Sequence, residues 1–184
     1  MRISYNAPVI LTYTLLATLV LAADQFVGHL IADYFTVFAR FDSSAAIDYV
    51  RLFSHVLGHS DWNHLIGNFS FILLIGPILE EKYGTVAILL MILVTALLSG
   101  LLNIFFFSTG LMGASGIVFM LILLSSFTNF RSGQIPLTFI LIVALFLTKE
   151  ILNAFAFDNI SQFAHIIGGI CGSIFGLIFT KERN

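Results

Sequence analysis

The sequence has few charged residues, no excess of positive charge and a single cysteine. Of its 184 residues, 10% are charged and 59% are hydrophobic, whereas a soluble domain has about 25% charged residues. With 8 Lys and Arg against 10 Asp and Glu, the chain has no basic surface to bind nucleic acid. The lone Cys171 excludes a disulfide framework and a zinc site built from cysteines. These shortages exclude a soluble globular domain, a disordered chain and a nucleic-acid binder, and they leave an integral membrane protein.

Six apolar stretches are candidates for membrane-spanning helices, each of which needs roughly 20 apolar residues to cross about 30 Å of hydrocarbon. The stretches cover residues 8–23, 63–79, 86–107, 113–127, 136–155 and 162–179. Backbone in lipid must satisfy its own hydrogen bonds, so the sequence predicts an all-α, polytopic bundle of six transmembrane helices, forming one domain over residues 1–184. The first stretch also resembles a signal peptide, but its removal would leave five spans in need of a new packing partner.

The distribution of positive charge predicts the orientation of the chain. An even number of spans places both termini on one side. That side holds Arg2, Lys82, Arg131, Lys181 and Arg183, whereas the other side holds Arg40, Arg51 and Lys149. Cytoplasmic loops carry the excess of Lys and Arg, so we expect both termini in the cytoplasm.

The connection between the first two spans, over about residues 24–62, is unusually long and rich in Phe and Tyr. We expect it to fold and to lie partly in the membrane interface. The alternative is an extracytoplasmic loop that packs on top of the bundle.

Polar residues inside a membrane are costly, and are therefore candidates for function. His64 and Asn68 are four residues apart, so they share one helix face; the alternative role is a hydrogen bond between helices. Ser115 lies between Gly113 and Gly116 at the start of a span, where backbone and substrate can approach closely. The free N–H groups of a helix start suit an anion, although a capping Ser among small residues is the simpler interpretation.

His165 precedes Gly168, Gly172 and Gly176, and glycines four apart make a groove for another helix. The alternative is a histidine that is satisfied at a helix interface. The second, fourth and sixth spans run in the same direction, so all three polar features lie within about 10 Å of the outer boundary. Three such features at one depth predict a single site.

Together these residues supply a nucleophile, a base and oxyanion donors. The Ser115 hydroxyl needs a base, for which His165 is the candidate. The donors are the Ser115 backbone N–H, the Asn68 amide and His64. No acid occurs in the spans at this depth, so we expect a Ser–His dyad without a third member, and neither a metal nor a cofactor.

The chain resembles the rhomboid family of intramembrane serine proteases, in its minimal six-helix bacterial form. Residues 59–68 are similar to the family's HxxxN element, residues 113–116 to its GxSG motif and residues 164–172 to its AHxxGxxxG helix. Glu80 with Gly84 matches the end of the family's second helix. Arg51 falls at the Arg of the family's Trp-Arg pair, whereas Val50 replaces the Trp.

The resemblance implies Ser115 as nucleophile, His165 as base, and His64 and Asn68 as oxyanion donors. It implies a compact, partly membrane-embedded first loop. The implied substrates are single-span membrane proteins, cut near the extracytoplasmic face at helix-destabilising sequences with a small residue before the bond. The implied location is a bacterial cytoplasmic membrane, with the lipid bilayer and transmembrane substrates as the only partners.

Two other functions are compatible with the sequence. A non-proteolytic rhomboid-like scaffold or quality-control binding protein would share the fold but would not need Ser115 or His165. A metal transporter using His55, His59 and His64 is disfavoured, because the spans carry no partnering carboxylate and five residues separate the last two histidines. For a protease, we expect the fifth span and residues 157–161 to move and admit substrate.

Overall fold

The protein is described by a computed structural model that covers residues 4–127 and 159–181, with six positions between them (137, 140, 141, 144, 145 and 148). In this part of the chain the regular structure is helical, apart from one β-bridge between Val37 and Leu111. The main helices are α1 (Pro8–Phe26), α2 (Ala46–Ser54), α3 (Trp62–Tyr83), α4 (Thr85–Phe106), α5 (Ser115–Ser126) and α7 (Asn159–Lys181). Two short 3-10 turns, η1 (Ala32–Phe35) and η2 (His55–Leu57), flank α2.

The helical membrane fold predicted from the sequence is confirmed. By length and composition, α1, α3 and α4 are able to cross a membrane, and α5 and residues 163–179 are shorter apolar helices. The predicted fifth span, residues 136–155, is described only at the six separate positions given above. The fourth span begins at Ser115, two residues later than predicted, because Gly113 has a φ of +127° that no helix accommodates.

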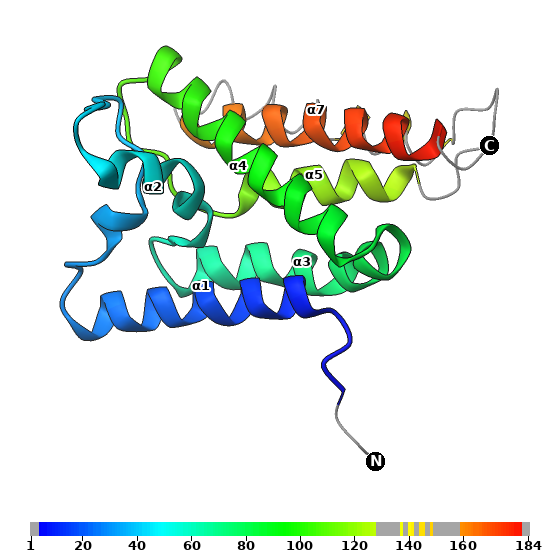
Figure 1. Cartoon of the computed structure of the whole chain (residues 1–184), viewed down its shortest axis with the longest axis horizontal. Helices are drawn as coiled ribbons and strands as arrows, with labels where there is room; N and C mark the ends of the chain where they lie inside the picture. The colour runs from blue at the N-terminus through cyan, green and yellow to red at the C-terminus, as the bar shows by residue number, and fades with distance from the viewer. Residues whose placement is uncertain are drawn as a thin grey trace.

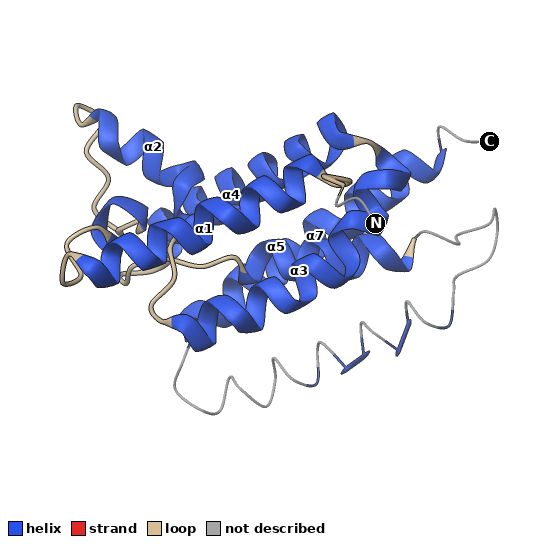
Figure 2. Cartoon of the chain, turned by 90° about the horizontal axis from the view of Figure 1, so that it is seen from below, coloured by secondary structure: helices blue, strands red, loops and turns tan. Residues whose placement is uncertain are grey.

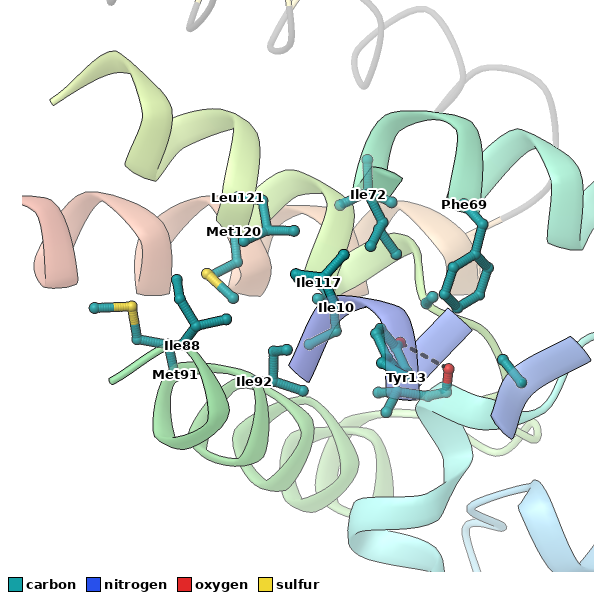
Figure 3. Packing of buried hydrophobic residues seen from close by; sticks show 14 of the residues in the cluster. Ile10, Tyr13, Phe69, Ile72, Ile88, Met91, Ile92, Ile117, Met120 and Leu121 are labelled. Atoms are coloured by element: carbon teal, nitrogen blue, oxygen red, sulfur yellow. Dashed lines mark hydrogen bonds between the residues drawn. The ribbon is translucent and has the colours of Figure 1, made fainter. Parts of the chain in front are cut away.

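The helices pack as two pairs, α1 with α3 and α5 with α7, and the pairs meet directly where α3 packs on α5. Figure 1 shows α1 beside α3, α5 beside α7, and α4 running obliquely across the bundle. Figure 2 shows the same helices from below, with α2 at one end of the bundle. The core lies where α1, α3, α4 and α5 meet, and Figure 3 shows Ile10, Ile72, Ile92 and Ile117 converging there.

Glycines permit the close contact between α5 and α7. A Cβ atom added to Gly168 would overlap the backbone carbonyl of Gly116, and one added to Gly172 would overlap that of Met120. Only a residue without a side chain allows backbones to approach this closely. The glycine groove of α7 is therefore filled by α5.

The long first loop is a folded segment. The Arg51 guanidinium donates from Nη1 to the Asp48 carboxylate (2.6 Å) and from Nε to the Asp33 carbonyl (2.9 Å). The other Asp48 oxygen accepts the Asp42 N–H at 2.8 Å. The Val50 side chain is exposed, so Arg51 anchors this loop without an aromatic partner at the preceding position.

Candidate active site

Ser115 is the first residue of α5, and the chain just before it is held by the long loop. Val37 and Leu111 exchange two backbone hydrogen bonds of 3.0 and 2.9 Å. The Gly113 N–H donates to the carbonyl of His55 at 3.0 Å. The nucleophile candidate therefore starts a helix whose preceding loop is fixed by contacts far away in the sequence.

Gly113 has no room for a side chain. A Cβ atom on this residue would lie 2.8 Å from Cε1 and 2.9 Å from Nε2 of the His64 imidazole. The positive φ of Gly113 is a second reason for glycine here. This close approach brings His64, at the start of α3, against the loop that precedes Ser115.

His165 lies on α7 where that helix contacts the first turns of α5. A Cβ atom on Gly116 would lie 3.1 Å from the carbonyl oxygen of Ala164, the residue before His165. The His165 side chain is buried, and its ring packs on Phe119 with the centroids 4.3 Å apart. Phe119 follows Ser115 by one helical turn, so His165 packs on the face of α5 that carries Ser115.

His59 links two elements of the site. Its Nε2 atom lies 3.2 Å from Nδ2 of the buried Asn68 and 3.4 Å from the Ala114 backbone nitrogen. Its Nδ1 atom lies 3.3 Å from the Leu57 carbonyl oxygen. These partners fit the tautomer with a proton on Nδ1, which leaves Nε2 to accept from both donors. The His59 and His64 rings are also in edge contact, with centroids 4.9 Å apart.

Burial keeps the loop histidines neutral. Removal from water and, to a smaller extent, the nearby His64 together lower the pKa of His59 to about 4. Burial also lowers the pKa of His55 to about 4, although its Nε2 lies 3.0 Å from the Ala96 carbonyl oxygen. Two neutral imidazoles therefore support the site at neutral pH.

Sequence reasoning considered His59 only as a metal ligand, and it gave no role to Phe119 or to a buried polar stripe on α4. Thr95, Ser99 and Asn103 lie four residues apart on one face of that helix and are buried. The Asn103 amide donates to the Thr109 carbonyl (3.1 Å) in the loop before Ser115. Three polar residues at helical spacing in an apolar span were a signal that could have found this stripe.

Two further expectations concern a metal site and the segment that admits substrate. Among the described residues, no three His, Cys, Asp or Glu side chains are grouped to hold a metal ion. The fifth span, expected to admit substrate, is described only at six separate positions. Residues 159–161, expected to belong to the mobile loop, form the start of α7, which begins three residues earlier than predicted.

Comparison with known proteins gives consistent matches. The sequence matches the family model of the Rhomboid domain over residues 47–182. It is 24% identical over 136 residues to Rhomboid protease GlpG of Haemophilus influenzae, across 72% of this chain and 71% of that protein. It is 31% identical over 137 residues to RHOMBOID-like protein 1 of Arabidopsis thaliana, across 70% of this chain and 34% of that longer protein.

Proposed function

The chain belongs to the rhomboid family of integral membrane proteins, and from this premise we propose that it is an intramembrane serine endopeptidase. Its substrates are transmembrane segments of other membrane proteins, cut near the extracytoplasmic face. Its proposed location is the cytoplasmic membrane of a bacterium, with both termini in the cytoplasm. The distribution of positive charge supports this orientation.

The contact between α5 and α7 carries this proposal. Ser115 and His165 belong to different spans, yet Gly116 and Ala164, their direct neighbours in sequence, are in backbone contact. A nucleophile and a base need this proximity to exchange a proton. A bundle that required only packing would not need a Ser and a His next to these two positions.

The proposed reaction uses the Ser115–His165 dyad. The Ser115 hydroxyl attacks the scissile carbonyl while His165 takes its proton, and His165 then protonates the leaving amine. A water molecule deprotonated by His165 next hydrolyses the acyl-enzyme and restores Ser115. The chemistry needs neither a metal nor a cofactor, because these two residues supply the nucleophile and the base.

The oxyanion donors are His64, the Asn68 amide and the Ser115 backbone N–H. A helix leaves the N–H groups of its first turn without intrahelical acceptors, which suits the position of Ser115. The Asn68 amide has two N–H groups, of which one faces His59 Nε2 and the other remains for the oxyanion. Gly113 allows His64 to approach the loop before Ser115, Gly116 allows α7 to approach, and Gly168 and Gly172 hold α7 against α5.

The rival function is a non-proteolytic rhomboid-like scaffold. The deciding experiment is cleavage of a single-span model substrate by purified protein in liposomes, with Ser115→Ala and His165→Ala beside the wild type. Ser125→Ala, on the same helix, is the matched control. We expect cleavage by the wild type and the control alone, and fluorophosphonate labelling that is lost in Ser115→Ala. Cleavage by the dyad variants contradicts the mechanism, and absence of both cleavage and labelling in the wild type favours the scaffold.

A further inference from the structure

An apolar groove lies away from the candidate active site, between α1 and α4. Its volume is about 410 Å³. Val9 and Leu16 of α1 form one wall and Leu89 and Leu93 of α4 the other. Phe53 of α2 and Val56 and Leu57 of η2 complete the lining, and we call these three residues the roof. Leu16, Leu89 and Leu93 are partly exposed, so the groove is open to the surroundings of the bundle.

The groove extends along only about half of α1. From Pro8 to Leu16, a rise of 1.5 Å per residue gives about 12 Å, against about 30 Å for the hydrocarbon of a bilayer. The roof is fixed at this height, because the Tyr13 hydroxyl donates to the carbonyl of Val56 at 2.9 Å (Figure 3). A groove of this length matches about one leaflet of hydrocarbon, and η2 bounds it at the level of Tyr13.

We propose that this groove binds one acyl chain of a membrane phospholipid from the leaflet at the N-terminal end of α1. A membrane-spanning helix of a partner is about 10–12 Å wide and would continue into the roof, so only a narrow, half-span ligand fits. The volume lies within the range of ligand pockets, about 300–1,000 Å³. Lipid tails are as apolar as leucine, so no hydrophobic driving force acts within the bilayer. Binding therefore relies on the van der Waals contacts that an acyl chain makes when it fills the groove.

The bound chain also supports the loop before Ser115. The roof includes Val56 and Leu57, which follow His55 in η2, and the His55 carbonyl accepts the N–H of Gly113. A filled groove limits movement of η2, and through it movement of Gly113. This consequence for activity rests on the proposed function, whereas the binding of the acyl chain does not.

Lipid binding is measured by native mass spectrometry on the full-length, delipidated protein in detergent, titrated with dioleoylphosphatidylcholine. Leu93→Trp and Leu16→Trp fill the groove from opposite walls. Leu90→Trp, which lies outside the groove on α4, is the matched control. We expect one lipid to bind the wild type and the control, and about tenfold weaker binding to both groove variants, because Trp takes the place of several methylenes.

Thermal melting of each variant separates loss of the site from loss of the fold. If either Leu93→Trp or Leu16→Trp fails to fold, the other variant provides the test. The proposal is overturned if the wild type binds no lipid, if the control loses as much binding as the groove variants, or if a second copy of the chain occupies the groove. No outcome depends on proteolysis, so the proposed function is tested separately.

Discussion

The imidazole of His165 lies against the phenyl ring of Phe119, with the centroids 4.3 Å apart and the ring planes tilted by 37°. Phe119 is on α5 and His165 on α7, so this contact joins the two helices of the candidate dyad. Phe119 follows Ser115 by one turn and therefore lies on the same face of α5. Its ring supports the His165 imidazole on this face.

We expect Phe119→Leu to lower kcat about threefold to tenfold and to leave KM nearly unchanged. The aromatic contact is worth about 0.5–1.5 kcal/mol, and without it the base is less well positioned. The measurement is cleavage kinetics of a single-span substrate, with the rate of fluorophosphonate labelling as a second readout. Phe71→Leu, at an exposed position on α3, is the control, and an equal effect of both substitutions contradicts the positioning role.

Gly168→Ala tests the backbone contact between α5 and α7. The added methyl group overlaps the Gly116 carbonyl, so the helices must separate. We expect a loss of about 1–3 kcal/mol in stability, measured as a lower melting temperature in detergent. Gly67→Ala has nothing within 4 Å of the new atom and is the control; it is expected to be neutral or stabilising. A tolerated Gly168→Ala contradicts the close contact.

Glu80→Gln tests how the start of α1 is held. The buried Glu80 carboxylate accepts the N–H groups of Val9 and Ile10, each at 3.0 Å, with one oxygen per donor. Gln keeps one acceptor and turns an amide N–H group toward the other donor. We expect a cost of about 1–3 kcal/mol, seen as a lower melting temperature. Glu81→Gln, the exposed neighbour, controls for charge and is expected to have little effect.

Stability is expected to fall as the pH decreases from about 6.5 to about 4. Burial lowers the pKa of His55 and His59 from 6.5 to about 4, so in this range the unfolded chain binds protons that the folded chain excludes. The stabilisation is fully present above the pKa of the unfolded chain, and it is lost as the pH falls to the pKa of the folded chain. Each unit of difference between the two pKa values corresponds to roughly 1.4 kcal/mol of folding free energy per histidine.

The measurement is the melting temperature between pH 4.5 and pH 8. Replacing His55 by Gln removes one of the two groups and is expected to reduce the slope. An unchanged slope in this variant, or a melting temperature independent of pH in the wild type, contradicts the buried neutral state.

The fold was largely predictable, because an apolar stretch long enough to cross the membrane indicates a helix at that place in the chain. The start of α5 was not, since it depends on the positive φ of Gly113 and on its close contact with His64, and neither is evident from the local sequence. Glycine spacing on α7 indicated a groove, but spacing alone does not identify the helix that fills it.

His59 was missed as part of the site for a related reason. One of its partners, Ala114, is 55 residues away in the sequence, and no local pattern connects the two. Long-range contacts of this kind emerge only from the tertiary structure.

His59 is proposed to position the oxyanion donors, and its replacement tests this role. His59→Leu removes the acceptor of both Asn68 Nδ2 and the Ala114 N–H, and leaves two buried donors without a partner. The Asn68 amide is then free to turn away from the oxyanion. Loss of one oxyanion donor costs about 10²–10³ in kcat, so we expect a decrease of at least about tenfold, with KM less affected.

His59→Gln separates positioning from a purely structural effect. The Gln side chain supplies an acceptor oxygen in a similar place, so we expect partial recovery of kcat relative to His59→Leu. His29→Gln, at an exposed loop position, is the control and is expected to retain wild-type cleavage. If His59→Leu and His59→Gln lose kcat equally while both keep the wild-type melting temperature, the acceptor at Nε2 has no part in the reaction, and the oxyanion assignment of Asn68 loses its structural support.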